Sequence, residues 1–233
     1  MSTRNWLCAY AITRNRGGLD LGPEPRLVGY RDLGVVVADV APARFDRVDT
    51  LDAVDGAVAE LAREHDAVVR AVFRHEAVLP LRFGTVLDGE DSVRRLLKVA
   101  YDQARDCLDE VEGHREWGVR VRASRPDTPG LYLVRRRERP KAILRTREDV
   151  VKIAARFEGA LRRHAADSIG RARPHGVLAN TAYLVETGRE AAFHAEFEWF
   201  ARELREAGAT VETTGPWPPY SFTDVELGVP ADD

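Results

Sequence analysis

A segment rich in proline and aromatic residues, close to the end of the chain, restricts the fold more than any other feature. Three of its residues are prolines, which lack a backbone N–H donor and hold φ near about −65°. The residues before them are biased toward extended backbone. We call this segment the strap; it comprises Gly215, Pro216, Trp217, Pro218, Pro219, Tyr220, Ser221 and Phe222. The pattern predicts a stiff, extended docking element that loses little conformational entropy on packing.

Composition and charge indicate an ordinary soluble protein. The chain has 233 residues, enough for two domains, with 44% hydrophobic and 31% charged residues. A net charge of −3 gives no overall attraction to nucleic acid or to anionic membranes. No stretch approaches the roughly 18 apolar residues of a membrane span. Cys8 and Cys107 are too few for a disulfide framework or a zinc site. We expect a protein of a reducing cytoplasm.

The first half of the chain predicts a mixed βββαβα domain over residues 1–112. Strand patterns cover 6–12, 26–30 and 35–40. A helix capped by Asp49 or Thr50 then follows, with apolar residues at three-four spacing up to Val72. Residues 78–86 return to extended structure. Residues 92–111 form a second amphipathic helix, with Val93, Leu96, Ala100, Ala104, Cys107 and Val111 on one face.

The second half, residues 113–214, predicts most of a ferredoxin-like, or split βαβ, domain. Strand patterns cover 117–123, 177–185 and 210–213. Residues 131–172 are helical in pattern, although Pro140 must end or kink the first part. Residues 190–207 form a second helix. The expected class is therefore α+β with two domains, followed by the strap and tail over residues 215–233.

No catalytic, metal-binding or cofactor-binding constellation is present in the sequence. The six histidines include no pair at metal-ligand spacing, and no phosphate-binding loop or nucleophile elbow occurs. His65 lies on an apolar helix face, where a hydrogen-bonded core histidine is the better interpretation. One alternative stays open: a ligand-binding or small-molecule-modifying enzyme whose pocket would include His75, Glu76 and Arg82.

Two surface features have a functional and a structural interpretation. Arginines and one lysine crowd residues 135–147, which suits nucleic acid or an acidic partner, but a solvated helix face explains them better. In the 190–207 helix, Phe193, Phe197, Phe200 and Leu204 share one face, as core residues do. Trp199 lies about 120° from that stripe. It is the aromatic residue that we expect to be exposed.

A second unusual segment combines proline, arginine and glycine with apolar residues. We call it the 78–86 motif; its sequence is Val78-Leu79-Pro80-Leu81-Arg82-Phe83-Gly84-Thr85-Val86. Pro80 suggests a strand edge, and Gly84 an unusual φ. Strand alternation places Leu81 and Phe83 on one face and Arg82 on the other. We expect the apolar pair to be buried and Arg82 to make a specific polar contact.

The 78–86 motif and the strap together resemble the GvpL/GvpF family of gas vesicle proteins over essentially the whole chain. This resemblance implies a two-domain α+β protein with a modified ferredoxin-like second domain. It also implies a non-enzymatic accessory protein without cofactors, located in the cytoplasm with gas vesicles. Its expected partners are the hydrophobic major shell protein, which it would keep from aggregating, and other accessory proteins. The residues marked by the resemblance are those of the two motifs, with Trp199 as a further interface candidate.

The strap is expected to join the two domains. If the last strand ends near Thr213, Gly215 to Phe222 leave the sheet, because their prolines cannot donate to a central ladder. Trp217, and with it Tyr220 or Phe222, would then pack on the first domain. Two alternatives are local packing on the second domain, or exposed aromatic residues that bind the shell protein directly.

Overall fold

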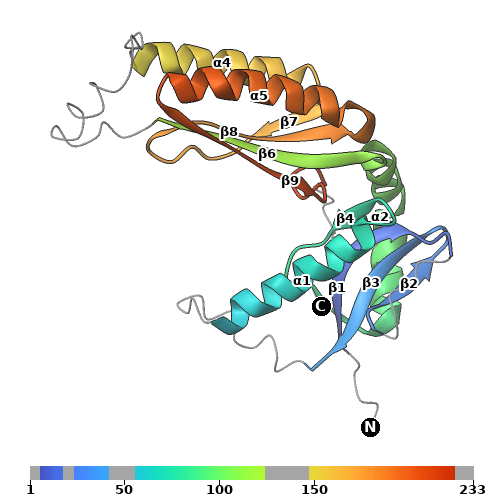
Figure 1. Ribbon diagram of the computed structural model, residues 1–233. Helices are drawn as coiled ribbons and strands as arrows, with labels where there is room; N and C mark the ends of the chain where they lie inside the picture. The colour runs from blue at the N-terminus through green and yellow to red at the C-terminus, as the bar shows by residue number, and fades with distance from the viewer. Residues whose placement is uncertain (1–5, 18–23, 42–55, 124–146, 224–233) are drawn as a thin grey trace. The chain divides into compact units, whose positions relative to one another are not determined.

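The chain folds into two compact units, each built from one antiparallel sheet and two helices in the described residues (Figure 1). The computed structural model describes residues 6–17, 24–41, 56–123 and 147–223. The first unit combines residues 1–113 with 218–233, and the second comprises 114–217. The α+β class expected from the sequence is confirmed. None of the described helices is long and apolar enough to cross a membrane.

Strand β1 (Trp6–Arg14) is the centre of the first sheet. It pairs with β3 (Leu33–Val40) on one side, and β2 (Arg26–Tyr30) pairs with β3 beyond it. On its other side β1 pairs with two short strands, β4 (Val78–Pro80) and β5 (Val86–Asp88). Every residue of β1 except Trp6 and Tyr10 is buried. Its nearly continuous apolar sequence is therefore that of a strand covered on both faces.

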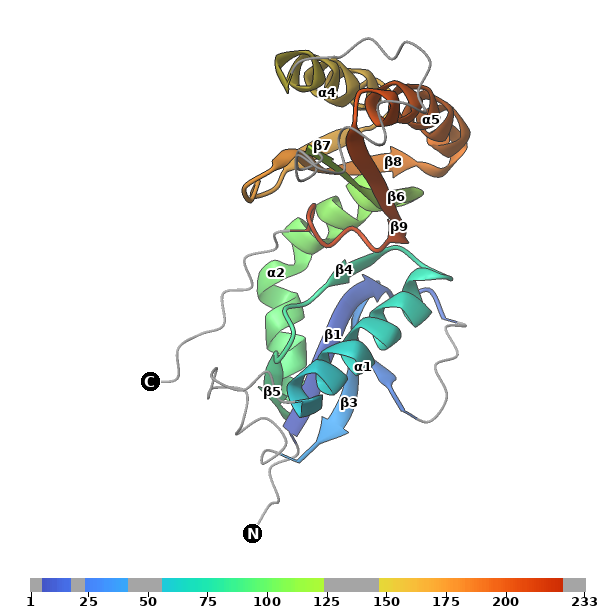
Figure 2. The same ribbon diagram turned by 60° about the vertical axis from the view of Figure 1, so that its left-hand side comes forward.

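Helices α1 (Gly56–Phe73) and α2 (Gly89–Val111) cover opposite faces of this sheet (Figure 2). Val69 and Val72 of α1 pack in one cluster with Ala11, Val36 and Val78 of the strands. The apolar stripe of α2 is buried as predicted, although Cys107 is only half-buried. The predicted cap of the first helix at Asp49 or Thr50 lies outside the described residues.

The second unit places α4 (Arg147–Arg162) and α5 (Glu190–Glu206) on one face of a four-stranded sheet (Figure 1). The sheet order is β7-β8-β6-β9. Its strands are β6 (His114–Ala123), β7 (Asp167–Gly170), β8 (Val177–Glu186) and β9 (Ala209–Trp217); the short helix η2 (Thr187–Arg189) precedes α5. The core between the layers contains Tyr183, Phe157, Phe193, Phe197 and Leu204, each at most 2% exposed.

This β-α-β-β-α-β order is that of a split βαβ unit. Strand β7 was missing from the sequence interpretation, which continued a helical pattern to residue 172. The strand has only four residues, Asp-Ser-Ile-Gly, and three of them are exposed, so it lacks an apolar signal. Pro140 and its predicted helix kink lie outside the described residues.

The predicted end of the last strand at Thr213 was wrong. Strand β9 continues through Gly215 and Pro216 to Trp217, which pairs with Glu116 of β6. The register shifts between the pairs of Glu116 and Gly118, where the ladder becomes irregular. Pro216 is tolerated there because β9 is an edge strand whose ladder is irregular at this point. Within the described residues, only 218–223 of the strap and tail leave the sheet.

Gly215 provides a direct test of this strand end. Its φ is +134°, and a Cβ at this position would lie 2.8 Å from the carbonyl oxygen of Glu116 and 2.9 Å from the ring of Trp117. We predict that Gly215→Ala lowers the free energy of unfolding by about 2–3 kcal/mol, measured by chemical denaturation. Gly159→Ala in helix α4 is the matched control, because a Cβ there meets no atom within 4 Å. Equal stability of the two variants would contradict the close approach.

Candidate functional site

Two adjacent residues of α1 contact the two sequence motifs. The Nε2 atom of His65 lies 3.2 Å from the carbonyl oxygen of Leu81 in the 78–86 motif. The next residue, Asp66, accepts a 2.6 Å hydrogen bond from the hydroxyl of Tyr220 in the strap. Asp66 also pairs with Arg70 one turn along the helix, at 2.7 Å. Helix α1 therefore connects two segments that are separated by more than 130 positions in the sequence.

The 78–86 motif is a turn between two strands, which corrects the continuous extended segment predicted from the sequence. The backbone N–H and the hydroxyl of Thr85 both donate to the carbonyl oxygen of Arg82, at 3.1 and 2.7 Å. Gly84 has a φ of +84°, which suits glycine at the third position of such a turn. The turn is fixed to β1 at both ends, since Leu81 donates to Tyr10 and Ala9 donates to Thr85, each at 2.9 Å.

The side chains of this turn differ in their exposure. Leu81 is buried, as the sequence indicated, whereas Phe83 is only half-buried, because the chain turns where a strand was expected. Arg82 is exposed, and its guanidinium makes no hydrogen bond or ion pair with the described part of the chain. The polar contact predicted for Arg82 is therefore not found there.

Residues 218–222 of the strap belong to the first unit. Pro218 and Pro219 are buried, and Tyr220 is 40% exposed with its hydroxyl on Asp66. Phe222 is half-buried. The expectation that Tyr220 contacts the first domain agrees with this geometry. Trp217, which was expected to do the same, lies at the end of β9 in the second unit.

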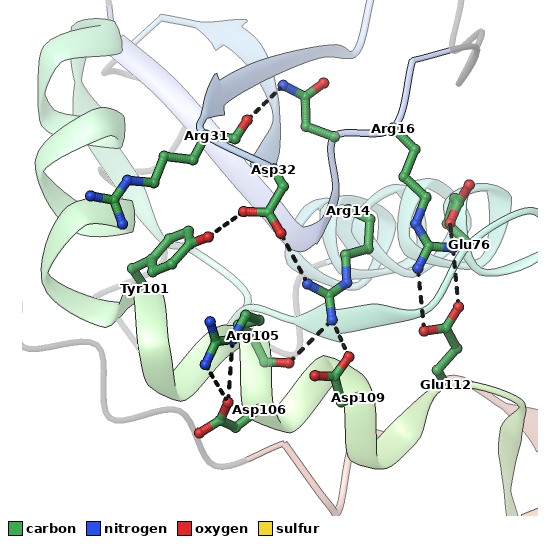
Figure 3. Close-up of polar contacts among 11 residues, drawn as sticks. Arg14, Arg16, Arg31, Asp32, Glu76, Tyr101, Arg105, Asp106, Asp109 and Glu112 are labelled. Carbon is green, nitrogen blue, oxygen red and sulfur yellow. Dashed lines mark hydrogen bonds and ion pairs between the residues drawn. The ribbon is translucent and has the colours of Figure 1, made fainter.

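A polar network surrounds the end of β1 (Figure 3). Arg14 is 8% exposed, although it carries a charge. Its guanidinium contacts the carboxylates of Asp32 and Asp109, and donates to the carbonyl oxygen of Arg105 at 3.4 Å. Beside it, Arg16 pairs at 3.1 Å with Glu112, the residue that follows α2. These contacts pair a nearly buried charge, which is costly to bury unpaired, although its Nε has no hydrogen-bond partner among the described residues.

Asp32 extends this network to the turn between β2 and β3. It accepts a hydrogen bond from the hydroxyl of Tyr101 in α2, which holds the pKa of its carboxyl below the usual value, with a smaller contribution from Arg14. The guanidinium of Arg31 stacks on the rings of Tyr30 and Tyr101, at 5.4 and 4.8 Å from their centroids. This network was not predicted from the sequence, although Arg14 at the end of an apolar strand indicates a charge that needs partners.

A small pocket of about 100 Å³ opens beside the 78–86 motif. Tyr10, His65 and Phe83 provide its aromatic lining, and Cys8, Leu61 and Val40 are among its other residues. His75, Glu76 and Arg82, which were proposed for an enzyme pocket, do not line it. Its volume is below the roughly 300–1,000 Å³ of most small-molecule sites. The described residues include no group of His, Cys, Asp and Glu side chains that could hold a metal ion.

Comparison with known proteins identifies the family. The gas vesicle synthesis proteins GvpL/GvpF match residues 7–224. The chain belongs to the GvpL/GvpF family. Gas vesicle protein L of Streptomyces sp. (strain CB03234) is 32% identical, with 97% of this chain and 95% of that protein covered. Gas vesicle protein F2 of Halobacterium salinarum is 29% identical over 86% of this chain and 81% of that protein.

A crystal structure shows the same fold. Gas vesicle protein GvpF of Anabaena sp. PCC7120 superposes with a TM-score of 0.68 at 17% identity, covering 95% of this chain and 97% of that one. The family resemblance drawn from the two motifs is thus confirmed. The GvpL/GvpF match extends over both units, so neither unit is an addition to an unrelated protein.

The remaining interface candidate of this GvpL/GvpF chain is Trp199 on α5. It is 57% exposed, as predicted, while Phe197 and Phe200 beside it are buried. Its ring lies edge-on to that of Phe200, with centroids 4.6 Å apart. The basic tract over residues 135–147 lies outside the described residues, except for the backbone of Arg147 at the start of α4.

The contact between the strap and α1 can be measured by a double-mutant cycle with Tyr220→Phe and Asp66→Asn. We predict a coupling free energy of about 0.5–1 kcal/mol in chemical denaturation, since a partly exposed hydrogen bond to a carboxylate is removed. Tyr220→Phe combined with Asp32→Asn is the control, because Asp32 has other partners. A coupling no larger than in this control would show that the contact does not stabilise the fold.

The Asp32 contact predicts a pH effect. A folded-state pKa below the unfolded one means that Asp32 contributes stability above the unfolded pKa, near 3.8. That contribution is lost as the pH falls through the folded pKa. Tyr101→Phe should raise the pKa of Asp32 in a carboxyl NMR titration and reduce this acid dependence. Tyr220→Phe should leave the titration of Asp32 unchanged. An unaltered pKa in Tyr101→Phe would assign the shift to the backbone hydrogen bond at Asp32 and to the nearby arginines.

Proposed function

We propose that this protein is a non-enzymatic accessory protein that binds the hydrophobic major shell protein in the cytoplasm and keeps it from aggregating before gas vesicle assembly. The main support is the family match, which covers residues 7–224 and places the chain among proteins of gas vesicle formation. A shell subunit with a large apolar surface is prone to aggregation until it polymerises. Shielding that surface requires a binding face and no reacting groups.

The α1 side of the first unit is the binding face that we favour. Arg82 and Tyr220 are exposed there, on segments that α1 holds through consecutive residues. Half-buried Phe83 adds an aromatic edge. Arginine and aromatic residues are enriched in protein interfaces and contribute much of their binding energy. Because the backbone beneath them is fixed to β1 and α1, these side chains are presented without much further ordering.

Trp199 on α5 is a second candidate contact, for another accessory protein or for the vesicle itself. A single exposed aromatic residue beside buried neighbours is a weaker indication than a set of residues on two segments that one helix contacts. We therefore assign the shell protein to the first unit and treat Trp199 as a separate surface.

Co-expression with the major shell protein tests the proposal. The wild-type chain should raise the soluble fraction of the shell protein and retain it in an affinity pull-down. Arg82→Ala should reduce the retained amount several-fold without changing the unfolding midpoint, since the residue is exposed and its guanidinium makes no hydrogen bond or ion pair with the described part of the chain. Arg202→Ala on α5, also an exposed arginine, is the matched control.

Two outcomes would contradict this function. Absence of the shell protein from the wild-type pull-down, with no change in its solubility, would remove the proposed partner. Equal retention by Arg82→Ala and Arg202→Ala would move the binding face away from the 78–86 motif.

A further inference from the structure

The pocket beside the 78–86 motif has an aromatic interior. The rings of Tyr10 and His65 have their centroids 5.2 Å apart, and those of His65 and Phe83 are 5.8 Å apart with nearly perpendicular planes. The three rings come from β1, α1 and the turn, and all three line the pocket. Faces of aromatic rings attract cations, and sets of such rings are a recurring way to bind them.

The rim of the pocket is acidic. Glu24, Asp39 and Glu64 line it, and each of them is exposed. Arg26 pairs with Asp39 at 3.0 Å but does not itself line the pocket. These carboxylates come from the segment before β2, from β3 and from α1. A cation that enters the pocket therefore meets acceptors on more than one side.

His65 lines the pocket without adding a positive charge. Its Nε2 faces a carbonyl oxygen, which can only accept, so this nitrogen carries the proton. Its Nδ1 then has a lone pair, and this buried atom has no hydrogen-bond partner in the described residues. Burial lowers the pKa of the ring, so the residue is neutral at pH 7 and does not repel a cation.

We propose that this pocket binds an arginine side chain of a partner protein. A volume of about 100 Å³ fits one side chain and excludes a larger ligand. The planar guanidinium stacks on aromatic rings and offers five N–H donors, which suits several acceptors around one opening. Its aliphatic stem would pack on Leu61 and Phe83. A neutral apolar side chain would make no favourable electrostatic interaction with the carboxylates of the rim.

The pocket is built before any partner arrives. The register shift of β1 between Ala9 and Ala11 lies at Tyr10, whose carbonyl oxygen accepts from Leu81. The hydrogen bond from His65 to Leu81 fixes the third wall relative to α1. Since its walls are joined by these bonds, little ordering is needed on binding. The inference rests on the proposed function, because it specifies the chemistry of the partner residue.

Small probes test the pocket without the shell protein. N-acetyl-arginine amide is titrated into the full chain while the ring signals of His65 and Phe83 are followed by NMR. We expect saturable shifts with the arginine probe, and at least tenfold weaker binding of N-acetyl-citrulline amide, which has nearly the same shape without the charge. Equal binding of the two probes would overturn the proposal, as would tighter binding of N-acetyl-lysine amide.

Variants locate the binding. Phe83→Leu keeps an apolar side chain but removes a ring, and should weaken the arginine probe at least fivefold; Glu64→Gln should weaken it in the same direction. Phe222→Leu is the matched control, because Phe222 is half-buried in the same unit and does not line the pocket. Unfolding curves confirm that each variant is folded. An unchanged affinity in Phe83→Leu would place the probe elsewhere and overturn the proposal.

The pull-down separates this inference from the proposed function. Loss of the shell protein in Phe83→Leu but not in Phe222→Leu would support both. Retention in both variants, with the probe lost from Phe83→Leu, would overturn the pocket as the partner site and leave the proposed function intact. Probe binding by a wild-type chain that never retains the shell protein would overturn only the proposed function.

Discussion

The first unit depends on the backbone hydrogen bonds of strand β1. A strand buried on both faces must pair its N–H and C=O groups along both edges, because an unpaired buried group is costly. On one edge β3 supplies an unbroken partner apart from the shift at Tyr10. On the other edge the partner is interrupted, with β4 and β5 covering the two ends and the turn of the 78–86 motif covering the middle. The turn of the 78–86 motif therefore lies where the middle of β1 needs backbone hydrogen-bond partners.

The same strand explains the charges at its end. Arg14 is the last residue of β1, and its side chain contacts a carboxylate and a carbonyl oxygen of α2 and the carboxylate of Asp32. Removing one partner of such a group costs more than the contact itself contributes, because the remaining charge stays desolvated. The network at Arg14 is thus a requirement of packing α2 against a strand that ends in arginine, and it needs no functional explanation.

Much of the architecture follows from apolar periodicity, and its exceptions have clear physical causes. The stripe of α2, the phenylalanines of α5 and the core role of His65 could be predicted because each depends on spacing within one helix. The turn at Arg82 and the end of β9 could not. Pairing with β1 decides the conformation of the turn, and pairing with β6 decides where β9 ends. Both partner strands are distant in the sequence. The contact of Asp66 with Tyr220 has the same cause.

The return of the strap to the first unit has a consequence for synthesis of the chain. The first unit is discontinuous: its sheet and helices are complete by residue 113, but residues 218–223 pack on it only after the whole second unit has been made. During translation the part of α1 that binds Tyr220 through Asp66 stays uncovered. That part of the helix is covered only in a full-length chain. A product that stops early within the second unit therefore differs from the finished protein on the very helix that joins the two motifs.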